Sequence, residues 1–357
     1  MKSNYDILGN HIRLIDTRNR ESITDRVLGI NIDKFFMPSV ANVIGTDLSK
    51  YKLITKGKFA CNPMHVGRDE RLPVALYDEE KPAIVSPAYF MFEVIDNSIL
   101  NEDYLMMWFR RPEFDRICWL HTDGSVRGGI TWDDICRLEL PIPPIEKQLE
   151  IVNSYKAITE RIALKQKIND NLDDTAQTLY QKYFESNSDK SSWKQGTVGD
   201  VLQLQRGHDL PRTEMTGGKY PVAGSTGTIG YHDEFTAEAP VIVMGRSGNI
   251  GNPRLYLCNC WTHNTSLYVK QIYEAEPLWV FYLLKNLNYD GFVGGSAVPT
   301  LNRNDVHAYG IAIPPLELQK SFSQKVMSLI YCKEENLSEI EKLQELQKII
   351  LTTMSSR

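Results

Sequence analysis

Residues 140–148 read LPIPPIEKQ, and residues 311–319 read IAIPPLELQ. A Pro-Pro pair followed by Glu and Gln thus occurs twice, at an offset of 171 (311 minus 140). Self-similarity at a fixed period indicates a duplicated architecture. A helix can begin at each pair, because a proline in the first helical turn loses no hydrogen bond. The chain therefore divides into two copies, each a globular segment followed by a turn and a helix.

Upstream of this pattern the two copies diverge. Ile130 still aligns with Leu301 at the same offset, whereas residues 8–10 (LGN) resemble residues 198–200 (VGD) at an offset of 190 (198 minus 8). The first globular segment therefore contains extra residues. Two unlike domains are predicted on one duplicated frame.

Each Pro-Pro pair opens a long run without glycine or proline, and the first run reaches about Glu185. Within both runs, selected positions alternate in steps of four and three, which is typical of a coiled-coil seam. The seam positions are Ile151, Tyr155, Ile158, Ile162, Lys165, Asn169, Leu172, Ala176, Leu179 and Tyr183 in the first copy, and Phe322, Val326, Leu329, Lys333, Asn336, Ile340, Leu343, Gln347, Ile350 and Met354 in the second.

We expect these two helices to pair with each other rather than to pack separately on their own domains. Each is about 35–40 residues long, against a typical mean of about 11–12. If they pair antiparallel about a common centre, Asn169 falls opposite Asn336, and a buried amide pair there fixes the register at some cost in stability. The residues expected to pair the helices are Ile158, Ile162, Asn169, Leu172, Leu329, Asn336, Ile340 and Leu343.

The helix length suggests a purpose. A helix of about 35 residues is about 50 Å long. Domains at opposite ends of such a rod would stand roughly one to two turns of B-DNA apart, at ~34–36 Å per turn. This spacing suits a target of two short half-sites with a fixed gap that is not read.

Composition limits the other possibilities. With 357 residues, 42% of them hydrophobic, the chain can form two domains with real cores. No window reaches the ~18 apolar residues of a membrane helix. The first residues lack the apolar core of a signal peptide, so we expect a cytoplasmic protein. The six cysteines form no C-x-x-C pair, and the seven histidines are scattered. We therefore expect reduced thiols and no metal site.

The net charge of −5 weighs mildly against nucleic-acid binding, because DNA attracts proteins mainly through its phosphates. The objection weighs less if basic partner subunits hold the DNA and this chain supplies the contacts to bases.

Several stretches resemble the target-recognition domains of type I restriction–modification specificity subunits. The second globular segment carries them at residues 220–232, 241–251 and 261–265, and the first resembles another branch of that domain at residues 47–52, 61–65 and 84–89. The two Pro-Pro-x-Glu-x-Gln turns with their helices resemble the conserved regions of the same family. The matches span nearly the whole chain in the family's order of domain, helix, domain, helix.

The resemblance implies an α+β fold with two mixed α/β target-recognition domains, separated by two long helices that form an antiparallel coiled coil. The implied ranges are 1–143 and 188–314 for the domains, and 144–187 and 315–357 for the helices. It also implies that the chain binds double-stranded DNA and two methyltransferase subunits, and recruits restriction-motor subunits. No cofactor is expected on this chain; S-adenosylmethionine is expected on the methyltransferase subunit.

Polar loop residues are the candidates for contacting DNA. Arg and Asn side chains suit bidentate contacts to guanine and adenine, while Ser and Lys also reach phosphates. For each candidate residue, the alternative is that it lies in a solvated loop. For Arg127, the alternative is a simple turn. The candidates are Lys219, Ser225, Thr226, Arg246, Ser247 and Asn249 in the second domain, and Asn62, His65, Arg68 and Arg127 in the first.

Two other classes of function stay open: a methyltransferase in its own right and a protein-binding scaffold. Residues 62–65 (NPMH) superficially resemble the Asn-Pro-Pro-aromatic motif of amino-methyltransferases, but Met64 and His65 replace the second proline and the aromatic residue. Gly224, Gly227 and Gly230 match neither common phosphate-loop spacing and indicate tight turns instead.

Overall fold

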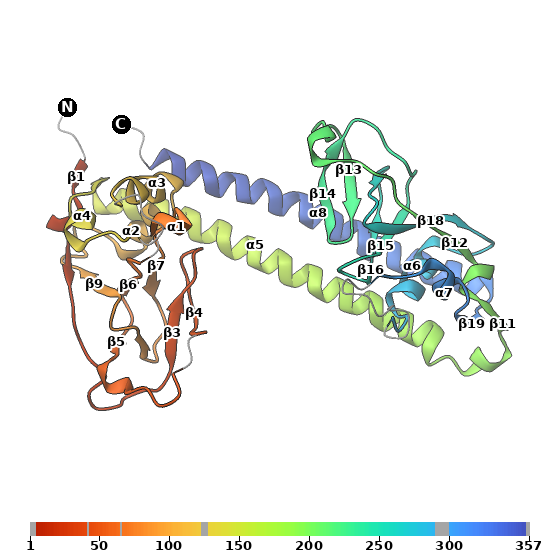
Figure 1. The fold of residues 1–357 in the computed structure, drawn as a ribbon, viewed down its shortest axis with the longest axis horizontal. Coiled ribbons are helices and arrows are strands. Elements are labelled where there is room, and N and C mark those ends of the chain that lie inside the picture. Colours follow the sequence, from red (N-terminus) through yellow and green to blue (C-terminus); the bar gives the residue numbers. More distant parts are fainter. Residues whose placement is uncertain (1–4, 41–42, 65, 123–127, 290–299, 355–357) are drawn as a thin grey trace. The chain divides into compact units, whose positions relative to one another are not determined.

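A computed structural model describes residues 5–40, 43–64, 66–122, 128–289 and 300–354. The chain forms two compact units, residues 1–164 with 339–357 and residues 165–338. Helices α5 (Ile145–Tyr180, yellow-green) and α8 (Leu316–Thr353, blue) each contribute to both units (Figure 1). The helices therefore form no separate body in this division, and the domain ranges implied by the resemblance stay a prediction.

The first unit holds two four-stranded sheets and four short helices. One sheet has the order β2-β9-β6-β7 and is antiparallel, and the other has the order β4-β3-β8-β5, in which β3 and β8 run parallel. The elements are β2 (Ile12–Leu14), β3 (Val27–Ile30), β4 (Phe36–Pro38), β5 (Lys52–Ile54), β6 (Lys58–Cys61), β7 (Val74–Tyr77), β8 (Ala83–Val85), β9 (Phe90–Val94), α1 (Val66–Asp69), α2 (Glu102–Phe109), α3 (Pro112–Leu120) and α4 (Trp132–Cys136).

The second unit is built on different sheets. A four-stranded sheet has the order β12-β18-β15-β16, and a three-stranded sheet has the order β14-β13-β17. The elements are β12 (Leu202–Arg206), β13 (Tyr220–Gly224), β14 (Gly227–His232), β15 (Val241–Gly245), β16 (Gly251–Tyr256), β17 (Trp261–Thr262), β18 (Ser266–Ile272), α6 (Pro277–Lys285) and α7 (Arg303–His307). A π-helical turn at Gln181–Glu185 follows α5.

Both units contain the same small set of strand pairs and backbone contacts next to the long helices, which we call the frame. Strand β1 (Tyr5–Ile7) pairs with β10 (Glu139–Pro141), and β11 (Lys194–Thr197) pairs with β19 (Gly310–Ile313), both antiparallel. The next residue then donates its backbone N–H to the segment after the short helix: Leu8 to Leu138 O at 2.7 Å, and Val198 to Tyr309 O at 2.9 Å. Positions 138 and 309 are 171 apart, so the repeat seen in the sequence is a repeated backbone contact.

A glycine follows in each copy at a point of close approach. A Cβ on Gly9 would lie 2.8 Å from the Cβ of Cys136, and a Cβ on Gly199 would lie 3.2 Å from the backbone oxygen of His307. Such distances are closer than ordinary packing allows. Cys136 and His307 are again 171 apart. Glycine lets α4 and α7 sit against the same turn in both units.

The glutamine of each Pro-Pro-x-Glu-x-Gln turn is fully buried and joins the long helix to a short one. Gln148 accepts a hydrogen bond from the Asn101 N–H at 2.9 Å and donates to the carbonyls of Ile99 and Pro143, both at 2.8 Å. Residue 101 caps the N-terminus of α2, where helical N–H groups lack intrahelical partners. The motif therefore satisfies buried backbone groups.

Gln319 does the same in the second copy. Its side chain accepts from the Glu276 N–H and donates to the Pro314 carbonyl, both at 2.9 Å, and Glu276 precedes α6. Gln148 and Gln319 are 0% and 1% exposed. Both copies thus use one device to fix the angle at which a short helix meets a long one.

The two long helices run antiparallel within each unit. In the first unit, Ile158 and Ile162 form a cluster with Ile340 and Leu343, and Gln347 Nε2 donates to Thr159 Oγ1 at 2.7 Å. All of the predicted seam positions are buried or half-buried. The predicted fold class, mixed α/β domains with an antiparallel coiled coil, is confirmed.

In the second unit, the seam has a polar centre. Asn336 Nδ2 donates to Asn169 Oδ1 at 2.9 Å, and both side chains are buried. Lys165 Nζ donates to Asn336 Oδ1 at 2.8 Å, and Lys333 pairs with Asp173 at 2.5 Å. The structure thus places the two amides face to face, where they specify one register of the helix pair.

Each hydrophobic core includes one end of α5 and the opposite end of α8. The first core contains Val152 of α5 and Met354 of α8, with Ile350 and Leu351 packed against it. The second core contains Tyr180 of α5 and Phe322 of α8, whose ring centroids are 6.0 Å apart. Aromatic burial of this kind contributes strongly to core stability. Neither domain is complete without both helices.

Candidate nucleic-acid interface

Two loops of the second unit come together at one edge of its sheets. Ser225 and Thr226 form the two-residue loop between β13 and β14, with Gly224 opposite Gly227. Gly227 has a φ of +122°, which glycine adopts without the steric cost that a side chain would meet. The Ser225 N–H donates to Thr265 Oγ1 at 3.3 Å, which ties this hairpin to the segment before β18.

Arg246, Ser247 and Asn249 lie on the connection from β15 to β16. The Arg246 N–H donates to the Thr265 carbonyl at 3.0 Å, and Ser247 makes an isolated bridge with Thr300. Four of the predicted residues, Ser225, Arg246, Ser247 and Asn249, are therefore brought together around Thr265. Lys219 is not among them, because it precedes β13 whereas Ser225 follows its other end.

Asn249 is committed to the loop itself. Its Nδ2 donates to the Ser225 carbonyl at 3.1 Å, and its Oδ1 accepts from Asn252 Nδ2 at 2.7 Å. A bidentate contact to adenine would need both ends of the amide. The structure therefore gives Asn249 a role in holding the two loops together, and base contact by it stays a prediction.

Lys219 and Thr226 are exposed. The Lys219 ammonium lies 4.7 Å from the centroid of the Tyr220 ring, a cation–π distance. Both side chains can reach a ligand without rearrangement of the fold.

A basic cavity lies beside these loops. Arg206, Arg246 and Arg303 line a hollow of about 430 Å³ together with Leu267, Thr300, Leu301 and Asn302. Sequence reasoning missed Arg206 and Arg303. They lie 97 positions apart (303 minus 206), and no local motif marks either one.

The first-domain candidates are less gathered. Asn62 follows β6, and its Oδ1 accepts the Met64 N–H at 3.1 Å, which forms a local turn. Arg68 is exposed and makes two hydrogen bonds to Asp69 at 2.6 and 2.9 Å. His65 and Arg127 lie outside the described residues. Asn62 and Arg68 are thus each engaged in a local contact.

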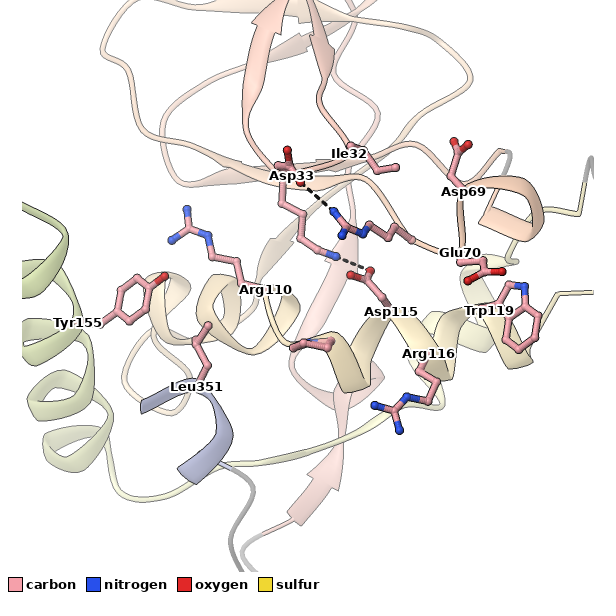
Figure 2. A pocket seen from close by; sticks show the side chains of 13 residues that line it. Ile32, Asp33, Asp69, Glu70, Arg110, Asp115, Arg116, Trp119, Tyr155 and Leu351 are labelled. Atoms are coloured by element: carbon pink, nitrogen blue, oxygen red, sulfur yellow. Dashed lines mark hydrogen bonds and ion pairs between the residues drawn. The ribbon is translucent and has the colours of Figure 1, made fainter. Parts of the chain in front are cut away.

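A hollow in the first unit has a mixed character. It measures about 770 Å³, and Figure 2 shows that Arg110, Arg116 and Trp119 share its wall with Asp33 and Glu70. Charges of both signs offer no uniformly positive surface for phosphate.

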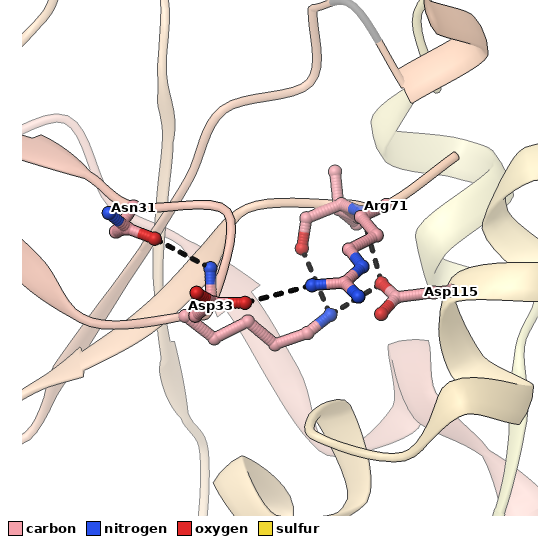
Figure 3. Close-up of polar contacts among 6 residues, drawn as sticks. Asn31, Asp33, Arg71 and Asp115 are labelled. Carbon is pink, nitrogen blue, oxygen red and sulfur yellow. Dashed lines mark hydrogen bonds and ion pairs between the residues drawn. The ribbon is translucent and has the colours of Figure 1, made fainter. Parts of the chain in front are cut away.

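A buried ion pair forms the base of this hollow. Lys34 pairs with Asp115 and donates to the Leu72 carbonyl at 3.2 Å, while the Leu72 N–H donates to the same carboxylate at 3.0 Å (Figure 3). Burial lowers the pKa of the Lys34 ammonium, and the charge of Asp115 opposes that shift. Arg71 pairs with Asp33 at 2.8 Å nearby. These contacts link the β3–β4 loop to α3 and are structural.

Two features of the described ranges bear on other functions. Those ranges contain no group of three or more His, Cys, Asp or Glu side chains that could hold a metal ion. None of the helices described there is both long and apolar enough to cross a membrane. All six cysteines are free, with Cys258 and Cys332 exposed.

Comparison with known proteins agrees with this architecture. Residues 190–349 match the family model described as the type I restriction modification DNA specificity domain. The MjaX type I restriction enzyme specificity subunit of Methanocaldococcus jannaschii is 22% identical over 98% of this chain and 88% of its own length.

Two solved structures share the fold. The type I restriction-modification S subunit from M. genitalium has a TM-score of 0.61 at 16% identity, and the match covers 99% of this chain and 96% of that one. A chain from a structure of type I R-M complex assembly and conformational transition has a TM-score of 0.50 at 16% identity, covering 98% and 96%.

The duplicated frame, the two unlike α/β domains and the buried helix seam make up a fold shared with these solved structures. The chain is similar to type I restriction–modification specificity subunits, as the resemblance in its sequence indicated. The relatives that it matches are named as specificity subunits, in line with a non-catalytic chain.

Proposed function

We propose that the chain reads a bipartite DNA target with an unread gap, one half-site for each domain. One observation carries this proposal: the two units share the same frame contacts, whereas their sheets differ. Identical frames position the domains equivalently, whereas unlike loops read unlike sequences. The match of residues 190–349 to a DNA specificity domain supports the same function for the second unit.

The proposal extends to partners. Two methyltransferase subunits would dock on the chain, carry S-adenosylmethionine and modify adenine, and restriction-motor subunits would join them. The net charge of −5 fits this division of labour, because partner subunits would supply most of the phosphate contacts. The chain itself would direct the partner subunits to the DNA target and would catalyse no reaction.

Selection from random DNA tests the proposal. The full chain, assembled with its methyltransferase subunits, is incubated with duplexes that carry a randomised central region, and the bound fraction is sequenced. We expect enrichment of two short defined blocks separated by a constant number of undefined base pairs. A protein-binding scaffold would enrich no common sequence, and that result would reject the proposal.

A domain control sharpens the assignment. Replacing the two residues of the β13–β14 loop (Ser225→Ala with Thr226→Ala) should alter at most one of the two blocks. Changes in both blocks at once would contradict one half-site for each domain. The chain purified alone should transfer no methyl group to DNA, and transfer would reassign it as a methyltransferase.

A further inference from the structure

The strand register of the second unit brings Arg206 and Arg246 to the same end of one sheet. Arg206, the last residue of β12, is paired with Leu267 of β18, and Leu267 is paired on its other side with Met244 of β15. Arg246 lies two residues beyond that pair. The two arginines therefore flank the start of β18 from opposite sides.

Arg303 joins them through a second backbone link. The Leu301 N–H donates to the Arg246 carbonyl at 2.8 Å, and the Arg246 N–H donates to the Thr265 carbonyl at 3.0 Å. The Gly207 N–H likewise donates to the Ser266 carbonyl at 3.1 Å. Backbone hydrogen bonds thus hold the chain segments that carry the three arginines next to the cavity. The positive charges of the cavity are therefore in place before any ligand binds.

The charges in this cavity are poorly compensated. No acidic residue is among the described residues that line it. Arg206 lies 3.8 Å from Asp209, whose Oδ1 also accepts from Asn264. Within the described parts of the chain, the guanidinium groups of Arg246 and Arg303 have no ion pair. Like charges held around one hollow repel each other unless an anion occupies it.

We propose that Arg206, Arg246 and Arg303 form a binding site for a backbone phosphate of the DNA, a role that rests on the proposed function. Arginine suits this ligand because its planar fork of donors matches phosphate oxygens. Ser225, Thr226 and Ser247 lie on the loops joined to the same segment. Phosphate contacts set register and orientation without reading sequence, so this site positions the neighbouring loops on the base edges.

Salt dependence distinguishes a phosphate contact from a base contact. The complex with methyltransferase subunits is titrated with its selected target duplex and with a random duplex of equal length, over a series of KCl concentrations. For the double variant Arg206→Ala/Arg303→Ala, we expect the slope of log affinity against log salt to become shallower by about one. Affinity should fall about tenfold for both duplexes, and the preference for the target should persist.

Matched variants separate this site from general charge. Lys194→Ala/Lys270→Ala removes two exposed positive charges from the same unit, at β11 and at the far part of β18, and should leave the slope unchanged. Arg303→Lys keeps the charge and should keep the slope while weakening binding slightly, because lysine lacks the fork.

Three results would overturn the assignment. A slope equal to that of the lysine control excludes a phosphate contact, and a loss confined to the target duplex indicates base reading instead. Failure of the double variant to assemble with methyltransferase subunits would show that the cavity takes an acidic segment of a partner. If the wild-type complex prefers no duplex, the proposed function itself fails, and this site falls with it.

Discussion

In the first unit Gln148 joins α2 to α5, and in the second Gln319 joins α6 to α8. The turns at Gly9 and Gly199 and the pairs β1–β10 and β11–β19 repeat in the same way. Every one of these repeated contacts lies in the small frame that carries the long helices. The duplication has therefore been retained in the frame.

Elsewhere the two units differ. The first contains two four-stranded sheets and a buried Lys34–Asp115 pair, whereas the second contains sheets of four and three strands and a basic cavity. The sheets thus differ between the units, while the paired strands of the frame repeat. The comparison indicates that the contacts that attach each domain to the long helices are repeated, whereas the sheets and loops proposed to contact DNA differ.

The largest effect is expected from the buried Lys34–Asp115 ion pair of the first unit. Lys34→Ala should destabilise the first unit by about 3–5 kcal/mol, because it leaves the Asp115 carboxylate buried without its partner. Hydrogen exchange followed by mass spectrometry should show faster exchange in α3 and β4, with the second unit unchanged. The double variant Lys34→Met/Asp115→Asn should recover most of that loss, and equal destabilisation by both variants would contradict the ion-pair explanation.

The shared glutamines should have similar effects in both units. Gln148→Ala and Gln319→Ala should each cost about 1–3 kcal/mol, because each leaves buried backbone groups without partners. The first should cost more, since Gln148 makes three such bonds and Gln319 makes two. Exchange at the start of α2 and of α6 measures this directly. The exposed Gln203→Ala is the control, and a response as large as that of Gln319→Ala would refute the argument.

Variants of the amide pair in the helix seam test whether this pair fixes the register of α5 against α8. Asn336→Leu alone should destabilise the seam by about 1–2 kcal/mol, because Asn169 then lacks its buried partner. The double variant Asn169→Leu/Asn336→Leu should match or exceed the wild-type unfolding temperature, since an apolar seam is stable, while cross-linking of cysteines placed along α5 and α8 reports more than one register. A single register in the double variant would show that the apolar positions suffice.

The smallest expected effect is a pH dependence of stability, which should differ between the two units. The Leu204 N–H donates to His307 Nε2 at 2.8 Å, which requires that nitrogen to be unprotonated. Burial, and then the charge of Arg303, lower the pKa of His307 from its ordinary 6.5. The unfolded chain therefore binds the proton more readily, and the second unit should lose stability as pH falls below about 6.5.

Cys136 occupies the equivalent place in the first unit, and burial raises the pKa of its thiol, so it contributes nothing in that range. Thermal unfolding of wild type and His307→Gln across mildly acidic pH checks the difference. An unaltered pH dependence in the variant would assign the effect to another group.

Much of the architecture could be predicted from the sequence because it depends on periodic and repeated features. The seam positions, the facing pair Asn169 and Asn336, and the duplicated turns all follow from spacing along the chain. Helix periodicity fixes which residues share a face, and an antiparallel arrangement then fixes which pairs meet.

The basic cavity could not be predicted in this way. Arg206, Arg246 and Arg303 converge only through the order β12-β18-β15 and its register, and neither is encoded in a local pattern. Nothing in the sequence marks Lys34 as buried, yet its side chain is 5% exposed and pairs with Asp115 of α3, 81 positions away. The hydrogen bonds of Asn249 to Ser225 and Asn252 likewise depend on which loops the fold brings together.

The end of α8 has a consequence for biosynthesis. Ile350, Leu351 and Met354 pack on the core of the first unit, although the ribosome adds them after the entire second unit. The domain that emerges first must therefore wait, with part of its apolar surface uncovered, until the end of α8 has been synthesised. A chain terminated after Ser338 would keep the α8 residues of its second unit and leave the core of its first without Ile350, Leu351 and Met354.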